Sequence, residues 1–199
     1  MGTEAQVASA AVLGESAPRW RRVAVPLAVL GATLGPVLDG FHTWSGTISY
    51  TSPGWLRSVW WCPPLFCAAA LAIGLSRLGL ESGVESRPPS RAAVAQGMAL
   101  FVVAYAVSGF LPASSLVKCA AVGALAAAGW LALDRTRAGL VHGALTAAGG
   151  WAVELTLVRG GFFVHRTTEL AGVAVWIPCL YISAATSIGL LARRLDSGR

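Results

Sequence analysis

The feature that most limits the fold of this chain is a series of six long apolar stretches that begins after residue 22. They lie at about residues 23–41, 59–80, 92–111, 116–133, 138–158 and 170–192. A membrane interior of about 30 Å is crossed by about 20 helical residues, because each residue advances the helix by about 1.5 Å. The sequence therefore predicts an all-α integral membrane protein, a bundle of six transmembrane helices within residues 23–195.

The amino-acid composition supports this prediction. Hydrophobic residues make up 55% of the 199 residues and charged residues 12%, whereas a soluble domain carries about 25% charged residues. So few charges cannot cover a water-facing surface, and a disordered chain would need the opposite balance. Residues 1–22 are nevertheless polar and are predicted to form a disordered cytoplasmic tail, and residues 196–199 a second, short cytoplasmic tail.

The distribution of Lys and Arg predicts the orientation of the helices, because cytoplasmic loops carry more of these residues. With the N-terminus inside, eleven basic residues fall on the inner side, and Arg57, Lys118, Arg159 and Arg166 fall on the outer side. Both termini are therefore predicted to be cytoplasmic, and the net charge of +6 reflects topology rather than nucleic-acid binding. The Arg, Ala and Gly content is typical of a bacterial source. We expect the bacterial cell membrane, or the endoplasmic reticulum membrane in a eukaryote.

The chain lacks the short motifs of common enzymes. H-E-x-x-H, G-x-S-x-G and the P-loop are absent, and His42, His142 and His165 are scattered. The four cysteines lie in apolar runs without a C-x-x-C motif or a nearby His, and thiols in such positions behave as small hydrophobic side chains. We therefore predict no enzyme activity, no catalytic residue, no metal site and no cofactor.

Two acidic residues lie inside apolar stretches, where a charge is costly and marks a candidate functional position. Asp39 and Glu154 are each sixteen residues beyond the start of their predicted helices, so both fall near the outer end. One interpretation is a polar site that faces a crevice, or a water-accessible path. The other is an interfacial ion pair, for example with Arg159.

Small residues four positions apart mark helix faces that pack closely in a membrane. Gly31 and Gly35 form one such face, and Gly139, Gly143 and Ala147 form another. Such faces serve packing within one bundle or between subunits. A homo-oligomer, either a dimer or a trimer, is thus compatible with the sequence.

Three motifs, in one order along the chain, resemble those of the Insig family. Residues 60–64, Trp-Trp-Cys-Pro-Pro, are similar to the Trp-Trp-x-Pro-Pro that opens the second helix of these proteins, and residues 73–75 follow at the family's spacing. Residues 134–139, Asp-Arg-Thr-Arg-Ala-Gly, resemble the family's Asp-Arg-Ser-Arg-Ser-Gly after helix four. Residues 176–179, Trp-Ile-Pro-Cys, resemble its Trp-Leu-Pro-Cys. The resemblance covers roughly residues 58–195.

The resemblance implies a six-helix membrane protein without enzyme activity. In eukaryotes the family binds oxysterols in a crevice among the helices and holds the sterol-sensing proteins Scap and HMG-CoA reductase in the endoplasmic reticulum. By position, Trp130 matches a Trp close to that crevice, and Asp134 matches an Asp needed for partner binding. Trp61, Trp151 and Glu154 complete the ligand-binding residues that we predict.

The chain departs from the family where the family's third helix and the turn after it carry polar residues. Residues 104–113 are largely apolar or small here, and Val117 stands where the family has Gln. The fold and the lipid crevice therefore carry over better than sterol regulation. We expect a neutral lipid such as diacylglycerol or an oxysterol as ligand, and a role as a lipid sensor or a regulator of partner membrane proteins. The alternatives are a small transporter or channel that uses Glu154 and Asp39, and a purely structural partner protein.

Overall fold

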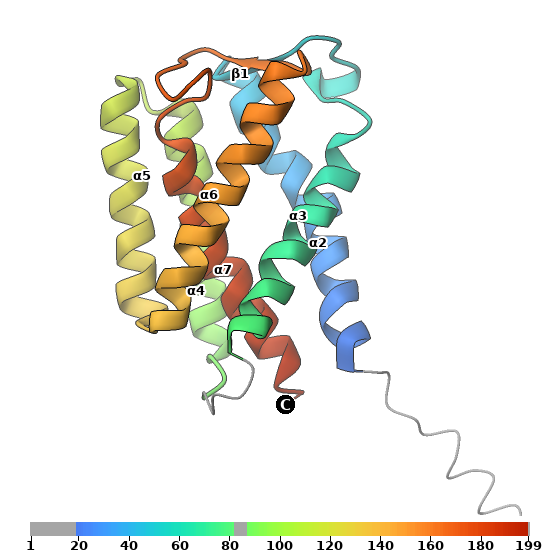
Figure 1. Ribbon diagram of the computed structural model, residues 1–199, viewed down its shortest axis with the longest axis vertical. Coiled ribbons are helices and arrows are strands. Elements are labelled where there is room, and N and C mark those ends of the chain that lie inside the picture. The colour runs from blue at the N-terminus through green and yellow to red at the C-terminus, as the bar shows by residue number, and fades with distance from the viewer. Residues whose placement is uncertain (1–18, 82–86, 199) are drawn as a thin grey trace, which may run out of the picture.

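Figure 1 shows the computed structural model of the chain, which describes residues 19–81 and 87–198. The described residues form six long helices, and Trp130–Asp134 adds one π-helical turn after the fourth of them. Their bounds are α2 (Arg19–Trp44), α3 (Cys62–Leu80), α4 (Arg91–Phe110), α5 (Ser115–Gly129), α6 (Arg137–Arg159) and α7 (Ile177–Asp196). The expected all-α bundle of six helices is confirmed.

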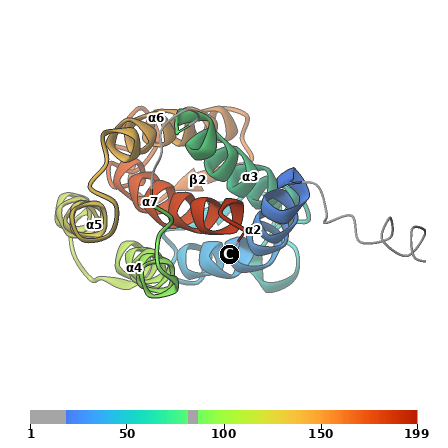
Figure 2. The same cartoon turned by 90° about the horizontal axis from the view of Figure 1, so that it is seen from below.

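Helix α7 is the centre of the bundle. It contacts each of the five other helices, which surround it in the view along the bundle axis (Figure 2). Residues 183–190 of α7 are all buried. Because protein covers it on every side, α7 tolerates hydroxyl groups that donate to backbone oxygens, such as Ser187 Oγ at 2.7 Å from the Gly97 carbonyl oxygen of α4. This bond also ties α7 to α4.

Four of the described helical segments are long and apolar enough to cross a membrane by length and composition. They contain α2, α3, α4 and α5 with its π-helical turn. Large apolar side chains are exposed along the bundle, as expected of a surface that faces lipid. We call the end of the bundle near Trp20 the inner end and the opposite end the outer end, after the orientation that the sequence predicts. Trp20, and Trp44, Trp55 and Trp60 near the outer end, are more than half exposed. Tryptophan is enriched at these depths because its ring suits the membrane interface.

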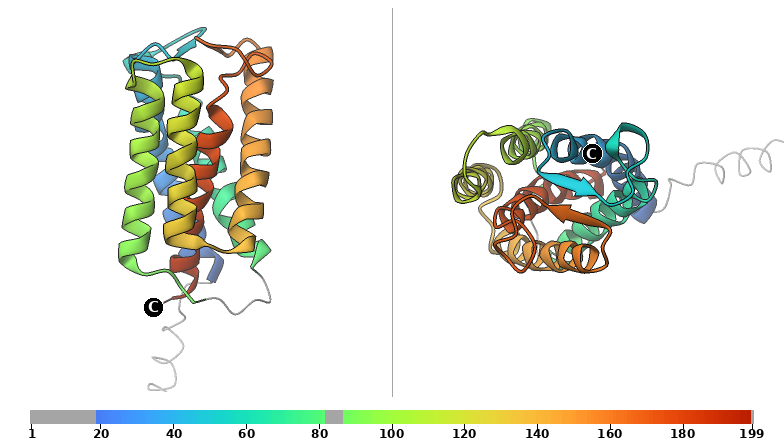
Figure 3. Two further views of the ribbon diagram at one scale, coloured as in Figure 1. Left: turned by 90° about the vertical axis from the view of Figure 1, so that its left-hand side faces the viewer. Right: turned by 90° about the horizontal axis from the view of Figure 1, so that it is seen from above.

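A small two-stranded sheet closes the outer end of the bundle. Strand β1 (Ile48–Tyr50) pairs antiparallel with β2 (Phe163–His165), and Tyr50 lies opposite Phe163. Alternate side chains of a strand point to opposite faces. Both strands are buried at their end residues and exposed at their middle residue. The cap therefore directs Tyr50 and His165 down into the bundle. The view from above shows the two strands lying across this end of the bundle (Figure 3).

The small-residue faces are used inside the bundle. A Cβ atom on Gly31 would collide with the Phe66 backbone, and one on Gly35 with the Phe66 side chain, so both glycines let α2 approach α3. A Cβ atom on Gly143 would lie 3.4 Å from Ile182 of α7. The interpretation of these faces as packing surfaces within one bundle is confirmed.

Several helix ends differ from the sequence-based ranges; among them, α7 runs on to Asp196, the first residue of the predicted C-terminal tail. Helix α2 begins at Arg19, so residues 19–22 are helical rather than part of a disordered tail, and the Arg21 guanidinium lies 5.2 Å from the centroid of the Trp20 ring. Helix α7 begins at Ile177 rather than near residue 170, because Ala171 and Gly172 have positive φ angles that a right-handed helix does not allow. Residues 1–18 of the predicted tail lie outside the described residues.

Candidate functional site

A cavity of about 740 Å³ lies between α2, α3, α6 and α7 and below the cap. This volume is within the range of small-molecule sites, about 300–1,000 Å³. Small residues on α3 and α6, such as Ala69, Ala72 and Gly149, leave the space open. The larger apolar side chains of its wall are Leu30, Leu34, Leu38, Leu65, Phe66, Ile73, Met98, Phe101, Leu145, Val153, Leu157 and Ile188.

Polar side chains gather at the outer end of this cavity, in a group that we call the outer acidic cluster. Its members are Asp39, Tyr50, Glu154, His165 and Tyr181. The Tyr50 hydroxyl donates to Asp39 Oδ2 over 2.8 Å. Burial, and then the Asp39 carboxylate, raise the pKa of the Tyr50 hydroxyl, so Tyr50 stays protonated and remains a donor.

The second carboxylate of the cluster is held from two other elements. Tyr181 of α7 donates its hydroxyl to Glu154 Oε1 over 3.2 Å, and His165 Nε2 lies 3.1 Å from Glu154 Oε2. His165 Nδ1 has no hydrogen-bond partner among the described residues. With a proton on Nε2, the His165 ring donates to the Glu154 carboxylate. The cap, α6 and α7 together orient the Glu154 side chain.

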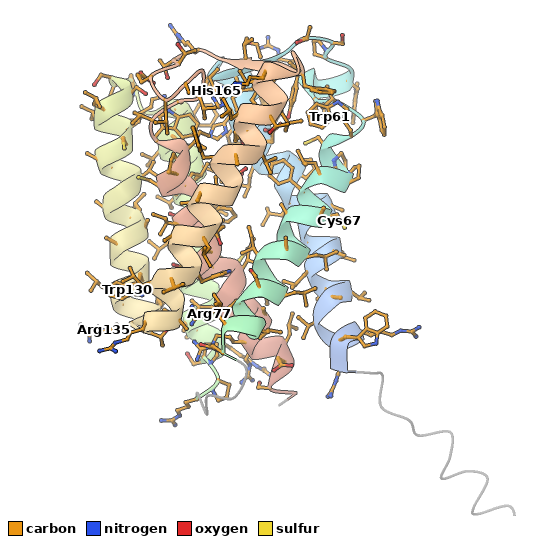
Figure 4. All side chains as sticks on the ribbon, in the orientation of Figure 1. Trp61, Cys67, Arg77, Trp130, Arg135 and His165 are labelled. Atoms are coloured by element: carbon orange, nitrogen blue, oxygen red, sulfur yellow. The ribbon has the colours of Figure 1, made fainter. Side chains whose placement is uncertain are left out.

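Aromatic rings support the cluster from the side of α4. The His42 ring stacks on Tyr105 and lies against Trp176, with centroids 5.0 Å apart in both pairs. His42 Nε2 lies 2.9 Å from Ser108 Oγ. On the other side, the Tyr50 ring meets Trp61 edge-on, with centroids 5.4 Å apart. Figure 4 shows Trp61 and His165 together near the cap.

The charged side chains of the cavity wall are all acidic among the described residues. Among the described residues, the wall includes the carboxylates of Asp39 and Glu154 and no Lys or Arg. Carboxylate oxygens offer several lone pairs each, and no hydrogen bond from another described residue to Asp39 Oδ1 is present. The outer end of the cavity therefore accepts hydrogen bonds and disfavours anions.

The inner end of the bundle carries a different polar group, which we call the inner ion-pair ring. It consists of Arg77, Glu81, Asp134 and Arg193. Arg77 Nη2 lies 2.8 Å from both Glu81 Oε1 and Asp134 Oδ1. Arg193 Nε lies 2.8 Å from Glu81 Oε2, and its Nη1 lies 3.5 Å from Asp134 Oδ1. The ring joins α3, the π-helical turn and α7 with two charges of each sign.

The motif at residues 134–139 contributes Asp134 to this ring. Thr136 Oγ1 donates to Asp134 Oδ1 over 2.9 Å and caps α6 by accepting from the Gly139 N–H. A Cβ atom on residue 139 would collide with the Asp134 carboxylate and approach Arg77. The Asp134 side chain is 3% exposed. The structure thus gives Asp134 an intramolecular partner, Arg77, and leaves almost none of its surface free.

The structure sorts the predicted ligand residues into two groups. Trp61 and Glu154 line the cavity. Trp130 and Trp151 do not. The Trp130 indole N–H donates to the Thr136 carbonyl oxygen, and that of Trp151 donates to the Leu170 carbonyl oxygen. These bonds hold the Trp130 ring beside the start of α6 and the Trp151 ring beside the segment before α7, so neither ring lines this cavity, and their part in ligand binding stays a prediction. Figure 4 shows Trp130 at the inner end, beside Arg135.

The interpretation of the two carboxylates as an interfacial ion pair with Arg159 is not supported by their contacts. Among the described residues, the partners of Asp39 are Tyr50 and Cys62, and neither Asp39 nor Glu154 pairs with Arg159. Sequence reasoning also missed Tyr50 and His165, which lie in the two short strands between the helices. Residues 48–50, Ile-Ser-Tyr, alternate apolar and polar side chains, but residues 163–165, Phe-Val-His, do not, so the sequence gives little signal for this pair of strands.

The comparisons with known proteins agree on one family, although no protein-family model matches the chain. The chain is 27% identical to the insulin-induced gene 1 protein of Gallus gallus over 93% of its own length and 78% of that protein. It is 28% identical to the insulin-induced gene 1 protein of Homo sapiens over 71% of its own length. That alignment spans 52% of the human protein, about half of its length.

Solved structures show the same architecture. The mycobacterial Insig homolog MvINS from Mycobacterium vanbaalenii superposes with a TM-score of 0.79 at 28% identity, covering 88% of this chain and 95% of that chain. A cross-linked trimer of MvINS superposes with a TM-score of 0.77 at 29% identity. Similarity over most of the sequence and a shared six-helix fold lead to one conclusion: the chain is an integral membrane protein homologous to the Insig proteins.

Proposed function

We propose that this protein binds a neutral lipid with a free hydroxyl group, such as diacylglycerol or an oxysterol, in the cavity between α2, α3, α6 and α7. The single observation that carries the proposal is a cavity with apolar walls and acceptor carboxylates at one end. Apolar area buried by the lipid contributes about 25 cal/mol per Å². A few polar groups then fix the orientation of the ligand.

The chemistry of the outer acidic cluster narrows the ligand class. A ligand hydroxyl can donate to Asp39 or Glu154, whereas a phosphate head group would bring negative charge against two carboxylates. Like charges in a medium of low dielectric repel strongly. Neutral lipids with a hydroxyl therefore fit the cavity better than anionic phospholipids do.

Lipid retained through purification tests the proposal. The wild-type protein should carry a neutral lipid that mass spectrometry identifies after extraction. Ala72 lines the cavity on α3, so Ala72→Trp fills the space and should lower the retained lipid by roughly tenfold, which corresponds to ~1.4 kcal/mol. Ala127→Trp is the matched control, because Ala127 is exposed on α5 and does not line the cavity. Equal retention in both variants would contradict the proposed site.

We further propose that the protein regulates partner membrane proteins and that both of its termini lie in the cytoplasm. We also propose that it forms a homo-oligomer, and the crystallised MvINS trimer supports a trimer here. Light scattering of the detergent-solubilised protein gives the number of chains per particle. A monomer at all concentrations would count against the oligomer.

Transport through Asp39 and Glu154 is the alternative function. Between the outer acidic cluster and the inner Ser76 and His142, the cavity wall is apolar apart from Thr146, and an ion path would need polar groups along its length. This supports lipid binding over transport. Proton or cation flux into liposomes that vanishes in Glu154→Gln would reverse that preference.

A further inference from the structure

Two cysteines that are 60 positions apart in the sequence meet at the outer end of the bundle. Cys119 lies in the first turns of α5 and Cys179 in the first turn of α7. Their Sγ atoms are 3.8 Å apart. Both residues are only partly buried, in contrast to Cys62.

The local packing brings these two thiols together and keeps them there. Gly123 follows Cys119 by one helical turn, and a Cβ atom on it would lie 3.5 Å from Cys179 Sγ, so α5 comes close to α7 at this level. Cys119 Sγ also contacts the Val175 carbonyl oxygen at 3.5 Å, just before α7 begins. A disulfide bond of about 2.05 Å needs the two sulfurs to move closer by less than 2 Å.

We propose that Cys119 and Cys179 form a reversible disulfide that fastens the outer end of α5 to the central helix α7. The reaction is thiol–disulfide exchange with an external disulfide such as oxidised glutathione. The thiolate of one cysteine attacks the external disulfide, which forms a mixed disulfide and releases one glutathione thiolate. The second cysteine thiolate then attacks the protein sulfur of the mixed disulfide and releases the other. Both cysteines lose their protons, the protein is oxidised by two electrons, and the glutathione disulfide is reduced to two thiols.

Because of the position of α5, the disulfide would restrain a helix that has few neighbours. Helix α5 lies at the edge of the bundle and has α4, α7 and its own connection to α6 as neighbours (Figures 2 and 3). A cross-link to α7 restrains it and closes a chain loop that contains all of α6, which reduces the freedom of the unfolded chain. The distribution of Lys and Arg assigns this end of the bundle to the outside of the membrane, where disulfides persist.

Peptide mapping tests the proposal on the full chain in lipid nanodiscs. The protein is incubated in reduced or in oxidised glutathione, denatured, alkylated and digested. After oxidation we expect a peptide that links Cys119 to Cys179, lighter than the sum of its two thiol peptides by two hydrogen atoms. Cys62 and Cys67 should remain free to alkylate. In parallel, the melting temperature should rise by several degrees on oxidation.

Serine variants separate the disulfide from general effects of the oxidant. Cys119→Ser should abolish both the linked peptide and the rise in melting temperature. Cys67→Ser is the matched control, since Cys67 lies in the second turn of α3, away from α5 (Figure 4), and should leave both unchanged. Free alkylation of Cys119 and Cys179 after oxidation would overturn the proposal, and so would mixed disulfides with glutathione as the only oxidised products.

Discussion

The two polar groups of this protein are both buried, yet they are built in opposite ways. The inner ion-pair ring has two positive and two negative side chains in contact with one another. The outer acidic cluster contributes two carboxylates to a cavity wall that has no Lys or Arg among the described residues. The ring satisfies its own charges and so serves the fold. The carboxylates of the cluster can still accept hydrogen bonds, and they face the cavity. A site that binds a hydroxyl-bearing ligand requires both features.

The strongest test of this contrast removes one charge from the ring. Asp134→Ala leaves Arg77 and Arg193 without one of their anions in a buried position, which should lower the free energy of unfolding by about 3–5 kcal/mol. Thermal unfolding in detergent measures the effect. Arg137→Ala, an exposed position in the same motif, should change stability little. A variant Asp134→Ala as stable as the wild type would show that the ring is not structural.

A loss of stability in Asp134→Ala would also change the interpretation of Asp134, for which the family resemblance implies a role in partner binding. Its carboxylate is nearly inaccessible, so we propose that it influences partners by holding α3, α7 and the turn before α6 together. Partner binding should then fall in Arg77→Ala as well, because Arg77 shares the same ion pairs. Loss of binding in the Asp134 variant alone would favour direct contact.

Substitutions in the outer acidic cluster should change the affinity for the ligand rather than the stability of the fold. Asp39→Asn and Glu154→Gln keep the side-chain shapes but remove charged acceptors, and a hydrogen bond to a charged group contributes about 1.5–3 kcal/mol. The affinity for a hydroxyl-bearing lipid should fall by about 10- to 100-fold. Native mass spectrometry with a titrated lipid measures this. Unchanged affinity in both variants would remove the cluster from the site.

A smaller effect should follow from adding a methyl group beside the ring. Gly139→Ala forces the Asp134 carboxylate to move and should cost about 1–3 kcal/mol of stability. Gly149→Ala, where nothing lies within 4 Å of an added Cβ atom, should instead stabilise its helix by up to about 1 kcal/mol. Similar melting temperatures for the two variants would argue against the close approach at Gly139.

The smallest effect concerns Trp130. Its indole N–H donates to the Thr136 carbonyl oxygen, outside the cavity. Trp130→Phe should therefore cost about 1 kcal/mol of stability and leave lipid retention at the wild-type level. A marked loss of retained lipid would instead return Trp130 to the ligand site.

The sequence predicts the bundle well because each apolar stretch must be long enough to cross a membrane. The spacing of small residues along the sequence, such as Gly31 and Gly35 four positions apart, also predicts close contacts between helices. The start of α7 was missed because residues 170–176 are as apolar as a helix, and only the backbone angles of Ala171 and Gly172 end that interpretation.

The candidate site was less predictable, because it depends on which distant residues meet. Asp39 and Glu154 stand out as charges in apolar stretches, but their partners Tyr50 and His165 come from the cap. The family resemblance placed Trp130 close to the crevice, but Trp130 does not line the cavity here. No sequence motif links Cys119 to Cys179. Their contact could not be predicted, because it arises only from the packing of α5 against α7.

The most direct test of the central claim compares two lipids with the same acyl chains, diacylglycerol and phosphatidic acid, which differ in a hydroxyl versus a phosphate group. Native mass spectrometry of the wild-type protein in a mixture of both reports their relative occupancy. A cavity whose described wall has acceptor carboxylates and no Lys or Arg predicts strong enrichment of diacylglycerol, reduced in Glu154→Gln. Equal occupancy, a preference for phosphatidic acid, or binding of neither lipid would contradict the account.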